Sequence, residues 1–211
     1  MNPQKSSLWS LTTGELLTRA ASSDPTPGGG SVAAIAGALG LGLVCMALEV
    51  SARRRDAAPE ALELLRQATR QLERLKVHPD ADVNAFEGYM AALALPKADD
   101  AQKTERKQAV QSASAAATEA PLSAARDLLA ALELTEQAAT LAHRSIVSDV
   151  GAGAYLLQAA LQATLLNVDI NLSSLPEDAR AQVLDERQRL ATQAREKASR
   201  IALMVATRLA L

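Results

Sequence analysis

Aromatic residues are almost absent from this chain: one tryptophan, two tyrosines and one phenylalanine occur among its 211 residues. Hydrophobic residues nevertheless make up 48% of the sequence, so any core has to be built from leucine, isoleucine, valine and alanine. Side chains of this kind favour helices that pack closely against one another. No shift in composition divides the chain, and we therefore expect one domain spanning residues 1–211.

Cysteine and an excess of one charge are also lacking. The single cysteine, Cys45, has no partner for an intramolecular disulfide. The net charge is -2 with both signs intermixed, which offers no basic footprint for nucleic acid. The first residues, MNPQKSSLWS, lack the basic-then-apolar layout of a secretory signal. We expect a cytoplasmic protein that binds no nucleic acid.

One long apolar stretch, Val32 to Val50, resembles a membrane span. It approaches the roughly 20 apolar residues that a bilayer crossing needs. However, it contains Glu49 and is rich in alanine and glycine, which gain little from lipid and much from close contact with other helices. The stretch is therefore interpreted as a buried core helix, and no membrane partner is expected.

Strand patterns are missing as well, because no stretch alternates strictly between apolar and polar residues. Apolar spacing and helix-boundary residues instead predict helices throughout. They begin near Thr12, Ser31 and Pro59 and cover about residues 79–95, 100–142, 145–171 and 176–211, with a bend or break at Pro121. The connections are short, so the fold class is all-α, an antiparallel up-and-down helical bundle.

Three consecutive glycines precede a serine in PTPGGGSVAAIAGALG, residues 25–40. No Lys-Ser/Thr pair follows, as a phosphate-binding loop requires, and no strand precedes, as a dinucleotide fingerprint requires. What remains is a helix N-terminus with little side-chain cover, where backbone N–H groups can hold an anion. The alternative is a tight turn with Ser31 as an ordinary N-cap, and the pattern leaves both open.

The stretch DVNAFEGYMAALALPK, residues 82–97, places Asp82, Phe86 and Tyr89 along one helix face. A carboxylate beside apolar rings can acquire a raised pKa and exchange protons near neutrality. Alternatively, both rings belong to the core and the acid occupies a first helical turn, where the helix dipole favours it. The spacing alone does not decide between a catalytic acid and a structural one.

The stretch HRSIVSDV, residues 143–150, offers His143, Ser148 and Asp149. A hydrolase triad is disfavoured, because residues six apart on a helix do not face one another. The two histidines, His78 and His143, have no second ligand at the spacing typical of zinc, so no metal site is expected.

Two asparagines stand one turn apart near a predicted helix end. Asn167 lies among leucine and valine residues, and a buried amide needs hydrogen-bond partners. Asn171 is accounted for as a helix terminator.

The order of four segments is more informative than any one of them. PTPGGGSVAAIAGALGLGLVCM, DVNAFEGYMAALALPK, ATEAPL and SDVGAGAYLLQAALQATLLNVDINL follow one another along a helical chain. This arrangement, over roughly residues 8–175, resembles the cyclodeaminase/cyclohydrolase family. That family includes the C-terminal domain of formiminotransferase-cyclodeaminase and stand-alone methenyltetrahydrofolate cyclohydrolases.

The resemblance implies an all-helical antiparallel bundle, usually a homodimer, that binds a folate in a cleft lined by the glycine-motif helix. Cyclodeaminases expel ammonia from 5-formiminotetrahydrofolate to give the 5,10-methenyl compound, and cyclohydrolases add water to that cation to give 10-formyltetrahydrofolate. The tetrahydrofolate derivative is the substrate, and no metal or redox cofactor is implied.

The same resemblance assigns roles to particular residues. Asp82 is expected to transfer protons and Asp149 to make a second polar contact with the pterin or the reacting carbon, because both reactions need a base and an acid beside a cationic carbon. Lys97 and Arg106 are expected to attract the glutamate tail. The remaining expected substrate-binding residues are Gly28, Gly29, Gly30, Ser31, Phe86, Ser148 and Asn167.

Two stretches depart from the family pattern. Ala142 and His143 stand where Gly-Asn is common, and SARRRD, residues 51–56, stands where Thr-x-Gly-Lys is common. The sequence does not decide between cyclodeaminase and cyclohydrolase. The alternative function is a catalytically inactive folate-binding or scaffolding bundle.

Overall fold

The computed structural model describes residues 6–55 and 57–210, and every regular element within these ranges is a helix. The all-α prediction is thereby confirmed. Residues 1–5, on which part of the secretory-signal argument depends, lie outside the described ranges. The α-helices are α1 (Thr13–Ala20), α2 (Gly29–Ala52), α3 (Pro59–Leu75), α4 (His78–Leu93), α5 (Asp100–Leu141), α6 (Val147–Asn171) and α7 (Glu177–Ala210), joined by the short 3-10 helices η1 (Leu8–Ser10), η2 (Arg144–Ile146) and η3 (Leu172–Ser174).

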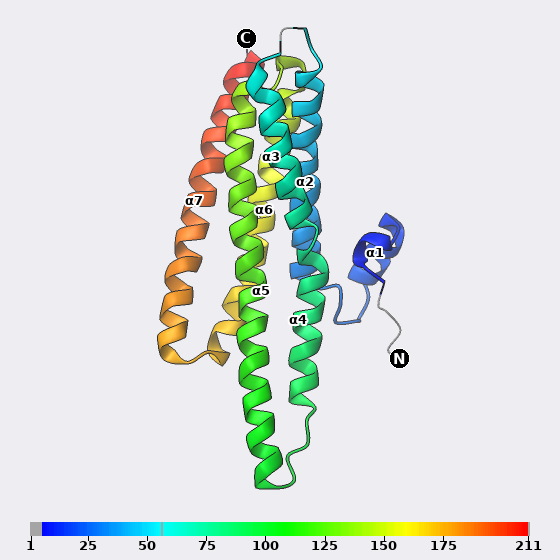
Figure 1. The fold of residues 1–211 in the computed structure, drawn as a ribbon, viewed down its shortest axis with the longest axis vertical. Helices are drawn as coiled ribbons and strands as arrows, with labels where there is room; N and C mark the ends of the chain where they lie inside the picture. The colour runs from blue at the N-terminus through cyan, green and yellow to red at the C-terminus, as the bar shows by residue number, and fades with distance from the viewer. Residues whose placement is uncertain (1–5, 56, 211) are drawn as a thin grey trace.

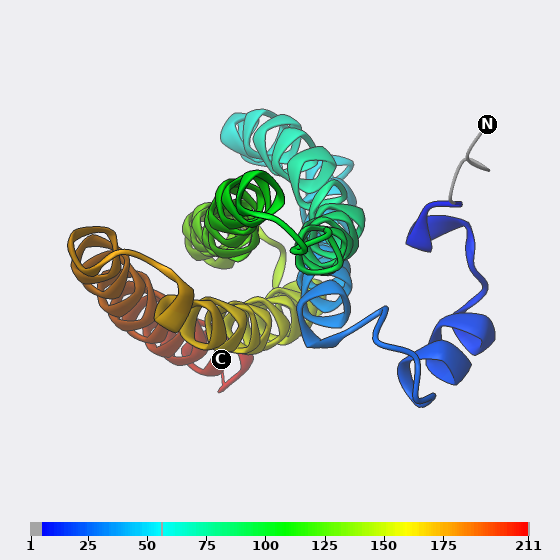
Figure 2. The same cartoon turned by 90° about the horizontal axis from the view of Figure 1, so that it is seen from below.

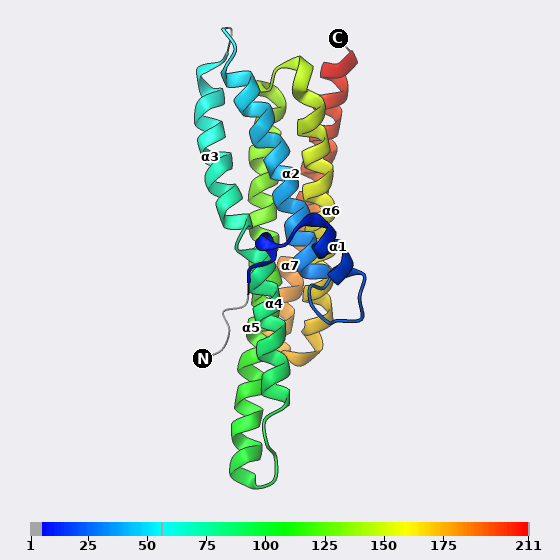
Figure 3. The same cartoon turned by 90° about the vertical axis from the view of Figure 1, so that its right-hand side faces the viewer.

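The long helices run up and down beside one another (Figure 1). α2 packs against α6, and α7 covers α5 and α6 (Figure 2). α3 and α4 follow each other along α5 (Figure 1). α1 and η1 lie to one side of the bundle, near the start of α2. The ends of α4 and α5 extend as a hairpin beyond the other helices (Figure 3), because α5 alone has 42 residues, about 63 Å of helix.

Glycines bring α2 and α6 into unusually close contact. A Cβ atom built on Gly153 would lie 2.6 Å from the backbone oxygen of Gly40 and 2.8 Å from a methyl carbon of Val44. Any larger residue at Gly153 would therefore push the two helices apart. Each helical glycine costs about 1 kcal/mol relative to alanine, and the tertiary packing that it permits offsets this cost.

The core is aliphatic. Its largest fully buried side chains are mostly leucines of α2, α3, α5 and α6. Helix α2 is long and apolar enough to cross a membrane by length and composition, yet 61% of its most apolar window is buried inside the bundle. It occupies the place that the sequence predicts for a core helix.

Helix α5 continues through Pro121, where the sequence predicts a bend or a break. Proline has no N–H, so it cannot donate the helical hydrogen bond to the carbonyl of Ala117 one turn earlier. The side-chain amide of Asn171, at the end of α6, donates to that carbonyl instead, with a nitrogen–oxygen distance of 2.8 Å. A neighbouring helix thus replaces the bond that the proline removes.

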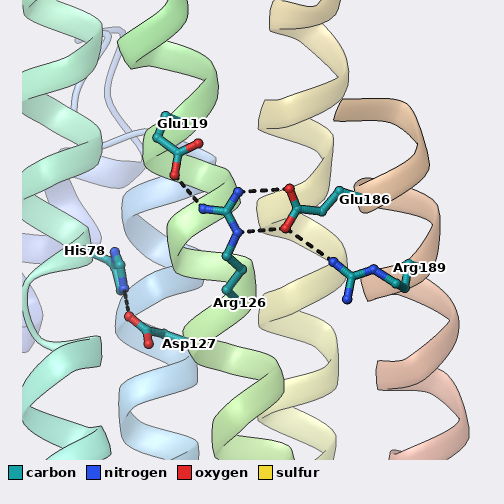
Figure 4. Close-up of polar contacts among 6 residues, drawn as sticks. All are labelled: His78, Glu119, Arg126, Asp127, Glu186 and Arg189. Atoms are coloured by element: carbon teal, nitrogen blue, oxygen red, sulfur yellow. Dashed lines mark hydrogen bonds and ion pairs between the residues drawn. The ribbon is translucent and has the colours of Figure 1, made fainter. Parts of the chain in front are cut away.

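A network of charges joins α5 to α7 (Figure 4). The guanidinium of Arg126 donates to Glu119 on its own helix and makes two bonds to Glu186 on α7, of 2.7 and 2.9 Å. Arg189 approaches the same Glu186 carboxylate at 3.6 Å. The hydrogen bonds from Arg126 hold the pKa of Glu186 below its ordinary value. Partly exposed pairs of this kind contribute little individually, and here they align two long helices.

His78 has a structural role at the start of α4. Its Nε2 lies 2.8 Å from a carboxylate oxygen of Asp127 on α5, and the imidazole is largely buried (Figure 4). Gln71 of α3 donates to the same aspartate. The arrangement ties α3 and α4 to α5.

Candidate functional site

A cavity of about 510 Å³ lies where the N-terminus of α2 meets α4, α5 and the C-terminal end of α6. We call it the Asp82 cavity. It is lined by Pro25, Thr26, Gly28, Gly29, Gly30, Asp82, Ala85, Phe86, Tyr89, Ala117, Asn167, Ile170, Asn171, Ser173 and Ser174. The glycine motif and the Asp82 segment, which the sequence presents as two separate features, therefore share one cavity.

The carboxylate of Asp82 is held against the first turn of α2. The buried hydroxyl of Ser31 donates to Asp82 Oδ2 at 2.6 Å. A Cβ atom built on Gly30 would lie 2.2 Å from Asp82 Oδ1, so the carboxylate occupies space that only a glycine leaves. The N-cap of α2 is Gly28, and no side chain caps this end. The reading of Ser31 as the N-cap is therefore wrong, since Ser31 lies inside the helix and orients Asp82.

The rings of α4 border the cavity instead of filling the core. Phe86 lies one helical turn after Asp82, and 38% of its surface is exposed. Tyr89 follows on the same face and also lines the cavity. The interpretation of Phe86 as a simple core residue is therefore wrong. An apolar wall beside a fixed carboxylate suits a flat heterocyclic ligand.

The two asparagines near the end of α6 also line the cavity. The amide nitrogen of Asn171 donates to the carbonyls of Ala117 and Asn167, at 2.8 and 2.9 Å. Asn167 donates to the carbonyl of Ala163, one turn earlier, at 3.4 Å. Asn171 is thus more than a helix terminator, because its side chain bridges α6 to α5 at the cavity wall.

Ser148 and Asp149 lie at the other end of α6. They belong to its first turn, whereas Asn167 belongs to its last turns, and the separation is about five turns, roughly 27 Å. A single chain therefore does not bring Asp149 to Asp82. The two stretches that depart from the family pattern meet at this same end, where the backbone N–H of His143 donates to the hydroxyl of Ser51 at 2.7 Å. Asp56 lies outside the described residues.

The expected cations also lie outside the cavity. Arg106 donates from Nε and Nη2 to the carbonyl of Leu93, at 3.2 and 3.1 Å, and so holds the C-terminus of α4. Lys97 is exposed in the α4–α5 connection. Arg19, which the sequence reading did not select, lines a smaller cavity of about 250 Å³. Thr26 lines both cavities, so the two are adjacent.

Sequence reasoning also missed residues at the edges of the cavity. Ser173 and Ser174 lie in η3, in the stretch NLSSLP that reads only as a polar turn, and Thr26 lies in the turn before the glycines. Isolated hydroxyls in turns carry no periodic signal. Within the described residues, the structure groups no three His, Cys, Asp or Glu side chains as a metal site.

Comparison with known proteins shows which family the chain belongs to. A family model described as Formiminotransferase-cyclodeaminase matches residues 12–190. The chain is 35% identical to a methenyltetrahydrofolate cyclohydrolase of Methylorubrum extorquens, over 77% of this chain and 79% of that protein. It is 34% identical to the formimidoyltransferase-cyclodeaminase of Gallus gallus over 72% of this chain, but spans only 29% of that longer protein.

A solved structure shares the fold. The crystal structure of formiminotetrahydrofolate cyclodeaminase from Thermotoga maritima superposes with a TM-score of 0.82 at 23% sequence identity, covering 94% of this chain and 98% of that one. The family match extends over most of the chain, from the capping box of α1 into α7. The chain therefore belongs to the formiminotransferase-cyclodeaminase family.

Proposed function

We propose that this chain is a folate one-carbon enzyme that acts on the unit bridging N5 and N10 of tetrahydrofolate, as a methenyltetrahydrofolate cyclohydrolase or a formiminotetrahydrofolate cyclodeaminase. The observation that carries the proposal is the Asp82 carboxylate, oriented by Ser31 in a cavity with an aromatic wall. The proposal is supported by the names of two relatives, a methenyltetrahydrofolate cyclohydrolase and a formimidoyltransferase-cyclodeaminase. The inactive scaffolding alternative gives no account of a buried serine devoted to one carboxylate.

In the hydrolytic direction, Asp82 takes a proton from water as the water oxygen adds to the cationic methenyl carbon. The bond from that carbon to N5 then breaks as the C=O bond forms, the proton on Asp82 passes to N5, and the remaining hydroxyl proton is released to solvent, which gives 10-formyltetrahydrofolate. In the deaminating direction, N10 adds to the formimino carbon, Asp82 accepts the N10 proton, and the amino group leaves as ammonia after protonation. In the deaminating direction the cationic carbon forms as ammonia leaves, so a carboxylate beside it lowers the barrier electrostatically. In the hydrolytic direction the carboxylate acts as the base that takes the proton from water. The substrate carries the one-carbon unit itself, and these steps use no further cofactor.

The direct experiment compares the wild type with Asp82→Asn. Purified protein is mixed with 5,10-methenyltetrahydrofolate, and loss of its near-ultraviolet absorbance is followed; a second reaction starts from the 5-formimino compound and follows appearance of that absorbance and release of ammonia. We expect acceleration in one reaction, and a loss of about 100-fold or more in Asp82→Asn. Asp185→Asn, on the exposed side of α7, is the matched control. If the wild type accelerates neither reaction, the proposed enzyme activity is disproved.

We also propose a homodimer through the outer faces of α2 and α6. Exposed apolar side chains run along both helices: Val32, Leu39, Met46 and Val50 on α2, and Tyr155, Leu156, Leu166 and Ile170 on α6. Among the residues of α2, Glu49 is the one with a charge. Ile170 also lines the Asp82 cavity, so the apolar face borders the site. A large unpartnered apolar face of this kind favours association.

Such a dimer gives Asp149 a place in catalysis. A two-fold axis crossing the middle of α6 at right angles exchanges its two ends. The midpoint between Asp149 and Asn167 falls within the apolar stripe from Tyr155 to Leu166. The partner's Asp149 would then reach the level of this chain's Asp82 cavity, together with the two stretches that depart from the family pattern.

Mixed dimers test this arrangement. Asp82→Asn and Asp149→Asn chains are each expected to be inactive, and unfolding and refolding them together forms heterodimers. If each site joins Asp82 of one chain to the partner's Asp149, half the dimers are mixed and carry one intact site, so about a quarter of wild-type activity returns. Refolding each variant alone is the control. Recovery of no activity in mixtures that form dimers would show that the site is not shared.

The glutamate tail of the folate needs a cation. We propose Arg19 for this role, since it lines the smaller cavity beside Thr26, whereas Arg106 already holds the C-terminus of α4 and Lys97 is outside the cavity. The tail then leaves the Asp82 cavity past Thr26. For the compartment we propose the cytoplasm, with α2 as a core helix.

A further inference from the structure

We infer that Asn171 is a fixed hydrogen-bond acceptor in the Asp82 cavity, held in place by the carbonyl that Pro121 frees, and that its Oδ1 accepts from an N–H group of the bound heterocycle. The inference rests on the proposed function and names the contact that orients the substrate. It assigns a ligand-binding role to a residue that the sequence presents only as a helix terminator.

The first step concerns the hydrogen bond that is missing from α5. Pro121 is buried within a continuous helix, and it has no N–H to donate to the carbonyl of Ala117. Ala117 is partly buried and lines the cavity, so without this donor its carbonyl would depend on water for a hydrogen bond. The Asn171 amide nitrogen, 2.8 Å away, supplies the missing donor from α6.

The second step is the orientation of the amide. Its nitrogen carries two hydrogens, and both are used: one by Ala117 and one by the carbonyl of Asn167, 2.9 Å away. Exchanging the nitrogen and oxygen ends would place Asn171 Oδ1 against two carbonyl oxygens, which is repulsive. The hydrogen-bond network therefore decides which end is oxygen.

The third step concerns the oxygen of the Asn171 amide, which remains free to accept a hydrogen bond from a ligand. Within the described part of the chain, no protein donor is bonded to Asn171 Oδ1, and both Asn171 and Ala117 line the cavity. An acceptor that is already oriented binds without loss of side-chain freedom. A reduced pterin presents several N–H groups along its edge, and these match an acceptor on α6 while Asp82 approaches from α4. The cavity thus holds the heterocycle between two polar groups from different helices.

The competing explanation is that Asn171 only satisfies the Ala117 carbonyl. Pro121→Ala separates the two roles, because alanine at this position supplies its own helical N–H to that carbonyl. We would compare the wild type, Asn171→Ala, Pro121→Ala and the double variant. The measurements are thermal unfolding by circular dichroism, steady-state KM and kcat, and calorimetric binding of 5-formyltetrahydrofolate as a non-reacting analogue.

Asn171→Ala is expected to melt at a lower temperature than the wild type, and the double variant to melt together with Pro121→Ala. KM and the dissociation constant are expected to rise five- to tenfold in the double variant relative to Pro121→Ala, the effect of one hydrogen bond, with a smaller change in kcat. Asn171→Ala alone, measured well below its melting temperature, should show the same rise, which keeps the test valid if the proline variants fold poorly.

Equal KM and equal analogue binding in the double variant and Pro121→Ala, with an active wild type, would overturn this inference and leave the proposed function intact. A wild type that neither turns over nor binds a folate would overturn the proposed function, and the inference with it. Weaker analogue binding together with restored thermal stability is the outcome that a purely structural asparagine does not produce.

Discussion

A methyl group added at Gly30 would collide with the carboxylate that we assign to proton transfer. The Cβ of Gly30→Ala would lie 2.2 Å from Asp82 Oδ1 and 2.7 Å from its carboxyl carbon, whereas ordinary contact begins at 3.4 Å. The carboxylate therefore has to retreat by about 1 Å, since the other partner is the helix backbone. That movement also breaks its 2.6 Å bond to Ser31.

The expected cost falls on the rate and much less on the fold. Misplacing a catalytic group by about 1 Å lowers the rate roughly 100-fold, about 2.7 kcal/mol of barrier. Loss of the hydrogen bond to the charged Asp82 lowers the free energy of unfolding by about 1.5–3 kcal/mol, and replacing a helical glycine by alanine raises it by about 1 kcal/mol. The net loss of about 1 kcal/mol corresponds to a melting temperature lower by roughly 2–4 °C.

The assay is kcat from the absorbance change of the methenyl compound, together with thermal unfolding. Gly14→Ala is the matched control, because Gly14 also lies in the first turn of a helix, does not line the Asp82 cavity, and would place its Cβ within 4 Å of no atom; it should retain full activity. If Gly30→Ala keeps kcat within about twofold of the wild type, the position of this carboxylate does not control the rate, and the assignment of Asp82 fails.

Three further predictions concern the tail, the packing and the charges. Arg19→Ala should raise KM about tenfold without changing kcat, whereas Lys97→Ala should leave both constants unchanged. If steady-state kinetics instead show a raised KM for Lys97→Ala and an unchanged KM for Arg19→Ala, the tail lies along the α4–α5 hairpin. Gly153→Ala should lower the free energy of unfolding by about 3 kcal/mol in denaturant titrations, because its Cβ would lie 2.6 Å from the α2 backbone. Gly88→Ala, on the exposed side of α4, places its Cβ in open space and should be neutral or stabilising. The pKa of Glu186 is lowered in the folded state, so its contribution to stability is present above its ordinary value of 4.5 and is lost as pH falls through the lower, folded value. The difference in melting temperature between the wild type and Glu186→Gln should therefore shrink as the pH is lowered below about 4, and a difference independent of pH would contradict the pairing.

The helices themselves could be predicted because their signals are local. The expected span 100–142 is α5, Asp100–Leu141, and the expected span 145–171 is η2 followed by α6. Pro121, where the sequence predicts a bend or a break, does not interrupt α5. The Ala117 carbonyl accepts from Asn171 in another helix, and nothing in the residues around the proline predicts this donor.

The site was harder to predict than the helices. The glycine motif and Asp82 are separately visible, but their contact joins Ser31 to a residue 51 positions later. The family resemblance groups Asp149 with Asp82 because both occur in its recognisable segments, but the order of segments along a chain does not give the distance between them. Arg19 was missed because a single arginine in a short helix has no distinctive pattern.

By itself, the sequence determined the all-α class, most helix boundaries and the family, since helices depend on bonds four residues apart and on apolar residues that recur every turn. Only the tertiary structure decided that Ser31 orients Asp82, that Gly30 leaves room for that carboxylate, and that Asn171 completes the broken ladder of α5. These contacts join helices that are far apart in the chain, and their geometry depends on how the bundle packs. From the sequence, the glycines after Pro27 are compatible with a bare turn, and only packing shows that they line the Asp82 cavity.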